Sequence, residues 1–264
     1  MSIRAEVVAD HIINWLSDYA KGAGVDGFVV GVSGGIDSAV TATLCARTGL
    51  KITLVNMPIH QAQTEFERSN ELISQLVAHH DSVNGIEVDL TTTYDTFVEA
   101  LPEAEDLSGG LALANTRARL RMTALYSVAA QRRSLVVGTG NKIEDFGIGF
   151  YTKYGDGGVD LSPIADLVKS EVYALGEFLG VPKSIQEAAP TDGLWGDERN
   201  DEDQIGASYP ELELAMEQDS LIENGQLSVS SLEGREAEVY AIYKRLNTAN
   251  QHKMKPIPVC EIPR

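Results

Sequence analysis

A short apolar run, Phe28–Val32, leads directly into a turn rich in glycine and serine and then into a helical pattern. A continuous apolar run with branched residues is typical of a strand covered on both faces, so we expect this strand at the centre of a sheet. Further strand-like runs lie at 52–57, 86–90 and 135–137, and helical patterns lie at 3–19, 37–49, 65–78, 112–132, 166–179 and 232–246. This alternation predicts an α/β fold, a parallel sheet with helices on both faces.

The composition is that of an ordinary globular chain, with 264 residues, 43% apolar side chains and 23% charged side chains. We find no internal repeat and no linker, which predicts a single domain over residues 1–264.

The net charge of −18, from 21 basic and 39 acidic side chains, argues against sequence-independent binding to nucleic acid or to an anionic membrane. No stretch approaches the roughly 20 apolar residues of a membrane helix, and Met1–Arg4 begins no apolar signal segment, so we expect a cytoplasmic protein.

The turn after the first apolar run is the most informative string in the sequence. It consists of Gly31, Val32, Ser33, Gly34, Gly35, Ile36, Asp37 and Ser38. Glycines let the backbone approach a ligand closely, and the N–H groups at the start of a helix favour phosphate. Asp37 would repel phosphate, but it fits if a divalent cation lies between the two groups. Ser33 or Asp37 alone also fits the ordinary role of a helix cap, so only the whole string after a buried strand indicates a nucleotide site.

Two familiar phosphate motifs, the Walker loop and the dinucleotide motif G-x-G-x-x-G, are absent from this turn, and no lysine follows its glycines. The turn does contain G-x-S-x-G, the nucleophile elbow of serine hydrolases, with Ser33 at its centre and His252 late in the chain. That elbow normally follows several strands, whereas only a helical pattern precedes this one. The sequence therefore favours a nucleotide site over a hydrolase.

The segment Ser33–Ser38 resembles the pyrophosphate loop of the N-type ATP pyrophosphatases, which cleave ATP to AMP and diphosphate while they activate a carboxylate or carbonyl group. Four further segments together resemble ammonia-dependent NAD synthetase: 138–144, 149–160, Pro190-Thr191 and His252-Lys253. The run TKYGDG at 152–157 is the most specific to that family. The resemblance covers nearly the whole chain and implies an adenine nucleotide alpha hydrolase-like, Rossmann-like form of the α/β fold.

The resemblance also implies a reaction and a site. A homodimer would use ATP, magnesium and ammonia to amidate deamido-NAD through an acyl adenylate, giving NAD, AMP and diphosphate. The turn Gly31–Ser38 would bind ATP together with Thr139, Lys169 and Thr191. The residues for deamido-NAD would be Arg119, Lys153, Asp160, His252 and Lys253. Asp37 and Glu144 would hold magnesium, and with Lys169 they would be the catalytic residues.

Several of these residues also have an ordinary structural interpretation. Arg119 belongs to a cluster with Arg117 and Arg121, and such charge runs are usually solvated helix faces. In a chain of net charge −18, the same cluster also fits a substrate that carries phosphates. Lys153 and Lys169 equally fit exposed surface lysines.

Two positions depart from the family pattern. Ala188 stands where a lysine is often found, and Gly140 replaces a common acidic residue, so we expect ATP contacts to differ in detail. The acidic segment 192–203 matches the mobile lid of the family in position and carries the acid pair Asp201-Glu202. A solvated charge run is an equal interpretation of these acids.

A glutamine-hydrolysing enzyme would need a nucleophilic cysteine or an added amidase domain. Neither cysteine fits, because Cys45 lies in an apolar helical stretch and Cys260 in a proline-rich tail. We therefore predict free ammonia as the nitrogen donor and no glutaminase domain.

Two other functions remain open: another ATP pyrophosphatase, such as an amidotransferase or a tRNA thiolase, and a sensor that binds adenine nucleotide without catalysis. The acidic chain lacks the basic patches expected of a tRNA-binding enzyme.

Overall fold

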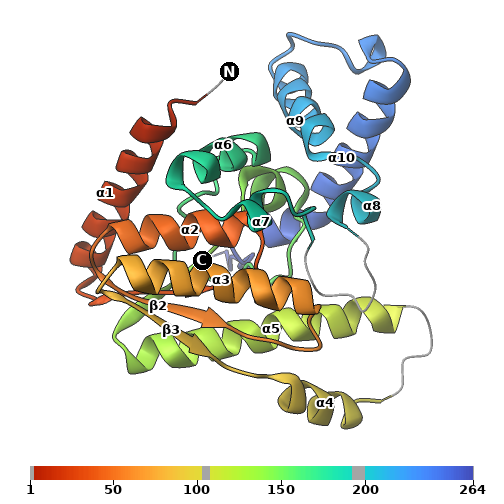
Figure 1. Ribbon diagram of the computed structural model, residues 1–264. Coiled ribbons are helices and arrows are strands. Elements are labelled where there is room, and N and C mark those ends of the chain that lie inside the picture. Colours follow the sequence, from red (N-terminus) through yellow and green to blue (C-terminus); the bar gives the residue numbers. More distant parts are fainter. Residues whose placement is uncertain (1–2, 103–107, 192–199, 264) are drawn as a thin grey trace.

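The central feature of the fold is a four-stranded parallel sheet (Figure 1). The computed structural model describes residues 3–102, 108–191 and 200–263. The strands are β1 Gly27–Gly31, β2 Lys51–Asn56, β3 Val83–Glu87 and β4 Ser134–Val137, in the order β3-β2-β1-β4. β1 pairs with β2 on one side and with β4 on the other, which confirms the central position predicted from its apolar run.

The side chains of β1 alternate between two apolar cores, one on each face of the sheet. Phe28 and Val30 belong to the first core and Val29 to the second, and all three are fully buried. The first core also contains residues of α1 Ala5–Ala23, α2 Ile36–Arg47, α3 Gln63–His79 and α6 Lys169–Leu179. Helix α5 Ser108–Gln131 contributes to the second core. Helices therefore cover both faces, as the alternation of patterns predicts.

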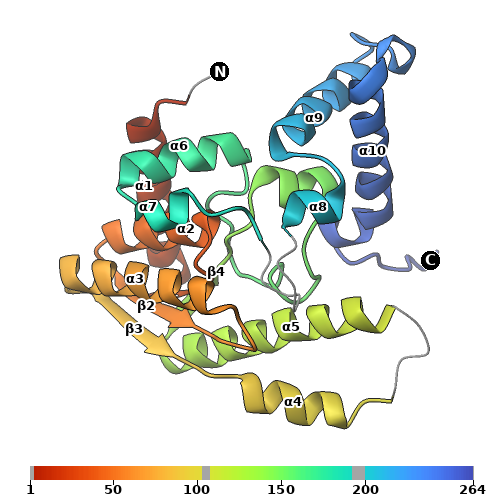
Figure 2. The same cartoon turned by 45° about the vertical axis from the view of Figure 1, so that its right-hand side comes forward.

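A third apolar core lies beside the sheet. Its members come from the π-helix η1 Ile143–Ile148, α8 Asp201–Ile205, α9 Tyr209–Glu223 and α10 Gly234–Met254. Figures 1 and 2 both show α9 and α10 side by side, away from the strands. The remaining short elements are α4 Thr91–Glu99, α7 Lys183–Gln186 and η2 Val229–Ser231. Because η1 follows β4 in the chain, it joins this third core to the edge of the sheet.

Some element boundaries differ from those expected from sequence. The strand expected at 86–90 spans Val83–Glu87 instead. Val88 and Leu90 lie beyond its end, and they are apolar because they pack against the core on the α5 side of the sheet. Helix α10 extends past Leu246, so His252 lies on its last turn and not in the proline-rich tail. Helices α4 and α9 were not expected, because polar and acidic residues interrupt their apolar patterns.

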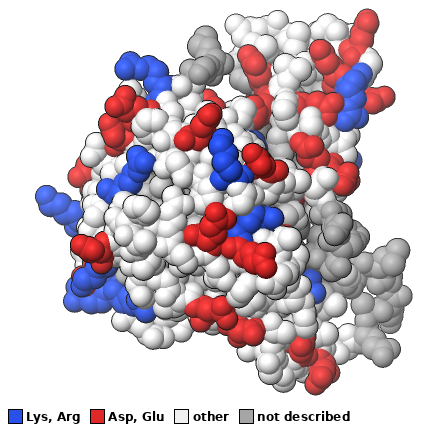
Figure 3. Space-filling view, viewed as in Figure 1, with Lys and Arg blue, Asp and Glu red and all other residues white. Residues whose placement is uncertain are grey.

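Acidic and basic side chains are interspersed over the face of the molecule shown in Figure 3, which is viewed as in Figure 1. A chain of net charge −18 attracts an anion only where cations gather locally. Among the helices that the structure describes, none is both long enough and apolar enough to cross a bilayer.

Candidate functional site

A cavity of about 240 Å³ opens at the carboxyl edge of the sheet. It is lined by the turn that follows β1 and by residues 137–140 at the end of β4. The strand order reverses between these two strands, because β2 and β3 lie on one side of β1 and β4 on the other. Ligands of open α/β sheets bind at such a reversal, outside the carboxyl ends of the strands. The cavity therefore lies where the topology and the sequence both predict a ligand site.

Serine hydroxyl groups stabilise the turn after β1. The Ser38 hydroxyl donates to the Gly35 carbonyl oxygen at 3.0 Å and accepts from the Ser33 N–H at 3.2 Å. In turn, Ser33 Oγ accepts from the Gly35 N–H at 3.2 Å. Helix α2 begins after Gly35, which has no side chain to cap its first turn. The backbone N–H groups at this helix start suit an anionic ligand.

Helix α3 packs directly against this turn at Gly34. Gly34 has a φ of +87°, and a Cβ there would lie 2.5 Å from the backbone oxygen of Glu65. Arg68 of α3 donates from Nε to the Gly34 oxygen at 3.1 Å. Gln61, which precedes α3, donates to the Ser33 oxygen at 3.2 Å. The shape of the turn therefore depends on α3, a contact that the sequence did not predict.

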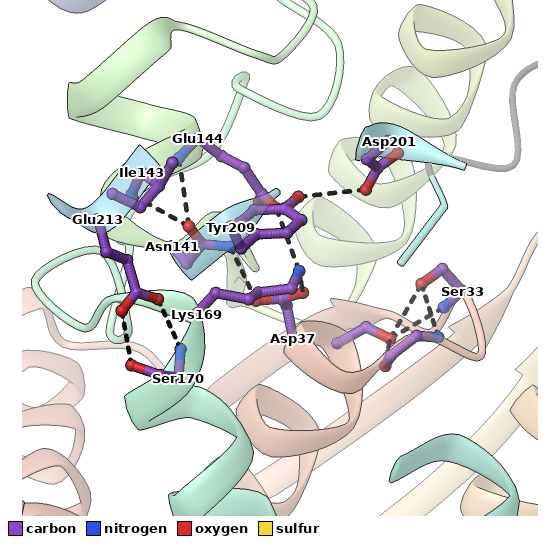
Figure 4. Close-up of polar contacts among 12 residues, drawn as sticks. Ser33, Asp37, Asn141, Ile143, Glu144, Lys169, Ser170, Asp201, Tyr209 and Glu213 are labelled. Atoms are coloured by element: carbon purple, nitrogen blue, oxygen red, sulfur yellow. Dashed lines mark hydrogen bonds and ion pairs between the residues drawn. The ribbon is translucent and has the colours of Figure 1, made fainter. Parts of the chain in front are cut away.

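Lys169 lies between two carboxylates at the edge of the cavity (Figure 4). Its Nζ is 2.5 Å from Asp37 Oδ2 and 3.2 Å from Glu144 Oε1, and the residue is only 3% exposed. Burial alone would lower the pKa of Lys169, but the charges of Asp37 and Glu144 outweigh it and raise the pKa. The lysine is therefore a buried, charged group, and the interpretation as a surface lysine is wrong.

Asn141 joins this cluster to the loop after β4. Its Nδ2 donates to Asp37 Oδ1 at 3.1 Å. Its Oδ1 accepts from the N–H groups of Ile143 and Glu144, at 3.1 and 3.2 Å. Asn141 is fully buried, so these hydrogen bonds fix the start of η1 relative to α2.

Tyr209, the first residue of α9, is the main member of the cluster that the sequence did not predict. Its hydroxyl lies 2.6 Å from Glu144 Oε1 and 3.2 Å from Asp201 Oδ2, and Lys169 Nζ lies 4.5 Å from its ring centre. One hydroxyl has one proton, so it donates to one of the two carboxylates at a time. Burial and the charges of Glu144 and Asp201 raise the pKa of Tyr209, which keeps it a neutral donor.

Asp201 belongs to the segment predicted to act as a lid. Residues 192–199 of that segment lie outside the described residues, and Asp201 begins α8. Asp201 is 5% exposed, and its neighbour Glu202 accepts from the Tyr209 N–H at 3.0 Å. The interpretation as a solvated charge run is therefore wrong for Asp201. The acidic run itself carries no signal that Asp201 would be buried beside Tyr209, which lies further along the chain.

Gly140, one of the two departures from the family pattern, lies against Asp145. A Cβ added at Gly140 would collide with the Asp145 carboxylate, so that side chain fills the space beside the glycine. Burial, and then the charges of Glu144, Asp156 and Asp37, raise the pKa of Asp145 to about 7. An acidic group therefore reaches this part of the cavity from position 145 and not from position 140.

The structure brings the predicted ATP residues together around one cavity. Those that line it are Gly31, Val32, Ser33, Gly35, Ile36, Asp37, Ser38, Thr139, Lys169 and Thr191. Gly34 lies behind them, against α3. Ala188 also lines the cavity, as do two arginines that were not predicted to contact ATP, Arg68 and Arg121.

The residues predicted to bind deamido-NAD lie elsewhere, and within the described residues none of the five lines the cavity. Arg119 of α5 approaches the backbone oxygen of Lys153 at 3.4 Å, and Lys153 Nζ donates to the His252 oxygen at 2.5 Å. Lys253 Nζ donates to two backbone oxygens in the segment 149–151, at 2.8 and 2.7 Å. These four residues therefore connect α5, the loop after η1 and the end of α10.

Asp160, the fifth of these residues, anchors the loop after η1 to β4. It accepts from the Val136 N–H at 2.8 Å and from the Tyr126 hydroxyl at 3.0 Å. Contact of Asp160 and of the other four residues with a dinucleotide stays a prediction.

The predicted magnesium ligands, Asp37 and Glu144, both face one positive charge, the Lys169 ammonium group. In the part of the chain that the structure describes, no three acidic, histidine or cysteine side chains form a metal-binding group. Magnesium is usually held by one or two carboxylates together with phosphate oxygens and water. Two carboxylates arranged around a cation therefore fit magnesium that is bound jointly with a phosphate chain.

The sheet, the turn after β1 and the cavity at the strand reversal define the class of this chain as an α/β nucleotide-binding protein. Comparison with known proteins narrows that class. A family model described as NAD synthase matches residues 8–257. The chain belongs to the NAD synthase family.

Similarity to individual members extends over almost the full length. The chain is 37% identical to the NH(3)-dependent NAD(+) synthetase of Carboxydothermus hydrogenoformans, covering 100% of this chain and 99% of that protein. It resembles the NMN synthetase of Francisella tularensis with a TM-score of 0.83 and 30% identity, covering 99% and 100% of the two chains. It resembles the NH3-dependent NAD synthetase of Campylobacter jejuni with a TM-score of 0.77 and 27% identity, covering 98% and 100%.

Replacement of Gly34 by alanine is expected to abolish the fit between α3 and the turn. Positive φ alone costs an alanine about 1–2 kcal/mol, and Gly34→Ala should lose more, because its Cβ meets the Glu65 oxygen. Gly49→Ala is the control, since Gly49 has a φ of +72° and open space around a Cβ. Thermal unfolding and calorimetric titration with ATP would measure both effects. Equal destabilisation and unchanged ATP affinity in the two variants would contradict the role of this contact.

The Tyr209 hydroxyl is expected to position Glu144 for a nucleotide. Tyr209→Phe should lower the affinity for ATP in the presence of magnesium by about tenfold, as the loss of one hydrogen bond to a charged group implies. Tyr240→Phe is the matched control, because the Tyr240 hydroxyl is also buried and donates to a carboxylate, Asp219 at 2.8 Å. Glu144, the partner of Tyr209, lines the cavity, whereas Asp219 does not. Both variants should lose similar stability in thermal unfolding, and a similar change in ATP affinity would refute the positioning role.

Proposed function

We propose that this protein catalyses the ATP-dependent amidation of deamido-NAD by ammonia, giving NAD, AMP and diphosphate. Membership of the NAD synthase family supports the reaction. The observation that carries the proposal is the single cavity in which the turn after β1 meets Lys169, Thr139 and Thr191. That cavity offers backbone N–H groups and a fixed positive charge to a triphosphate.

The chemistry explains why ATP is needed. A carboxylate resists ammonia because it is anionic and would have to expel oxide. When an oxygen of the nicotinate carboxylate attacks the α-phosphorus of ATP, the bond to the bridging oxygen breaks, diphosphate leaves and an acyl adenylate forms. Ammonia then adds to the carbonyl carbon, the nitrogen loses one proton to solvent, and the bond from that carbon to the phosphate oxygen of AMP breaks, so that AMP leaves. The protein mainly positions the reactants and stabilises charge.

Each part of the cluster has a task in this proposal. The N–H groups at the start of α2 bind phosphate oxygens, and Lys169 keeps a positive charge beside them. Tyr209 holds Glu144 in place. Asp37 and Glu144 would hold a magnesium ion. When bound, this ion would neutralise the charge that develops on the departing diphosphate.

A second candidate function differs from the first in the length of its substrate. The structurally similar protein from Francisella tularensis is an NMN synthetase. Within the described part of the chain, the cavity is lined by all the predicted ATP residues except Gly34 and by none of the five predicted dinucleotide residues. Amidation of nicotinate mononucleotide uses the same chemistry on a shorter substrate. It is therefore the alternative to deamido-NAD.

The homodimer is also part of the proposal, as is a cytoplasmic location. The five predicted dinucleotide residues lie outside the cavity of one copy of the chain. Their position supports the proposal that a second copy completes the dinucleotide site. A single peak at the monomer mass in light scattering at assay concentration would refute the dimer.

The reaction is tested by incubating the protein with ATP, magnesium, ammonium and either deamido-NAD or nicotinate mononucleotide. We expect amide product, AMP and diphosphate in equal amounts, with the higher kcat/KM for deamido-NAD, and no product when glutamine is the only nitrogen source. A preference for the mononucleotide would assign the alternative function. Binding of ATP without diphosphate release would indicate a nucleotide sensor.

Asp37→Asn should lower kcat by about 100-fold, as the loss of one group that stabilises transition-state charge implies, while the KM for deamido-NAD changes little. The reason is that Asp37 faces the phosphates of ATP and not the dinucleotide. Asp166→Asn is the control, because Asp166 also pairs with a lysine, Lys142 at 2.9 Å, but lies outside the cavity. Equal turnover of Asp37→Asn and the unmodified protein at saturating magnesium would refute this role.

A further inference from the structure

Arg68 lies on the second turn of α3 and lines the cavity beside the turn after β1. Its Nε donates to the Gly34 backbone oxygen at 3.1 Å. A Cβ at Gly34 would also lie 3.3 Å from the Arg68 Cβ, so the helix and the turn are in close contact at this arginine. The position of its guanidinium group is therefore fixed by the same turn that is proposed to bind phosphate.

The charge of Arg68 is uncompensated within the described ranges 3–102, 108–191 and 200–263. Its hydrogen bond through Nε is the only polar contact of its side chain there, and no carboxylate pairs with it. Lys169, which also lines the cavity, already faces Asp37 and Glu144. Both terminal nitrogens of Arg68 therefore remain for a ligand.

A purely structural role does not account for this arginine. A neutral amide could donate one hydrogen bond to the Gly34 oxygen equally well. A half-buried guanidinium group without an acidic partner is unusual in a chain with 39 acidic and 21 basic side chains. Arginine donates two parallel hydrogen bonds to the oxygens of a phosphate group, which makes a phosphate chain the ligand that fits.

We propose that Arg68 binds the β- and γ-phosphates of ATP and stabilises diphosphate as it leaves. This assignment rests on the proposed function for the identity of the reaction. In the step concerned, the nicotinate oxygen bonds to the α-phosphorus and the bond from that phosphorus to the bridging oxygen breaks. The electron pair of the broken bond stays on diphosphate. Arg68 forms no covalent bond and donates hydrogen bonds to the oxygens on which the charge accumulates.

The test compares the binding of diphosphate, ATP and AMP by calorimetry, with magnesium present, to the unmodified protein, Arg68→Gln and Arg68→Lys. Arg68→Gln should bind diphosphate and ATP about tenfold or more weakly, as the loss of charged hydrogen bonds implies. AMP, which lacks the outer phosphates, should bind all three proteins equally. Arg68→Lys should recover part of the loss, since it restores the charge without the paired donors.

Arg47→Gln is the matched control. Arg47 of α2 also donates to a single backbone oxygen, that of Leu179 at 3.2 Å, and it does not line this cavity. It should bind all three ligands as the unmodified protein does. Diphosphate affinity equal to that of the unmodified protein in Arg68→Gln would overturn the proposal, and so would an equal loss of AMP binding.

The binding measurements do not depend on turnover, so they separate this inference from the proposed function. If the unmodified protein makes no amide product but Arg68→Gln still loses diphosphate binding selectively, the phosphate role of Arg68 stands and the proposed reaction fails. If amide product forms and Arg68→Gln keeps both its diphosphate affinity and its kcat, the reaction stands and the role of Arg68 fails.

Discussion

The ion pairs of Lys169 with Asp37 and Glu144 are the interaction on which the rest of the site depends. Lys169 begins α6, Asp37 lies in the first turn of α2, and Glu144 lies in η1 after β4. One ammonium group therefore joins three elements at the carboxyl edge of the sheet. Loss of one partner from a buried ion pair commonly costs about 3–5 kcal/mol, because it leaves a buried charge uncompensated. The side chains that hold these elements together are thus the same ones that line the cavity.

The third core extends this constraint to the C-terminal helices. Tyr209 connects α9 to the ion pairs, and Glu213, also of α9, accepts from the N–H and hydroxyl of Ser170 at 2.8 and 2.7 Å. Helices α9 and α10 pack on each other beside the sheet. Their apolar core therefore holds Tyr209 and Glu213 in place against Glu144 and Ser170. The cluster contains three carboxylates, those of Asp37, Glu144 and Asp201, and one ammonium group. The cluster therefore carries surplus negative charge. A negatively charged triphosphate beside it needs further positive charge, which a bound cation and Arg68 of α3 would supply.

Much of the fold follows from local sequence. The apolar run of β1 and the regular alternation after it predict the central strand and the helices on both faces, since burial of a strand leaves a continuous apolar signal. Glu144 was predicted through a motif that resembles a family, and Lys169 through what that resemblance implies. Tyr209 and Arg68 were not, because only tertiary packing brings α9 to Glu144 and α3 to the turn after β1.

The contact between Gly140 and Asp145 has a consequence for how sequences of this family are compared. A side chain at 140 would meet the Asp145 carboxylate, so a larger residue at 140 requires Asp145 to move or to be replaced by a smaller residue. A column-by-column alignment would score an acid at 140 as lost here, although a carboxylate occupies nearly the same place. Substitutions at these two sites are therefore expected to occur as a pair during divergence, which links two alignment columns that have no motif in common.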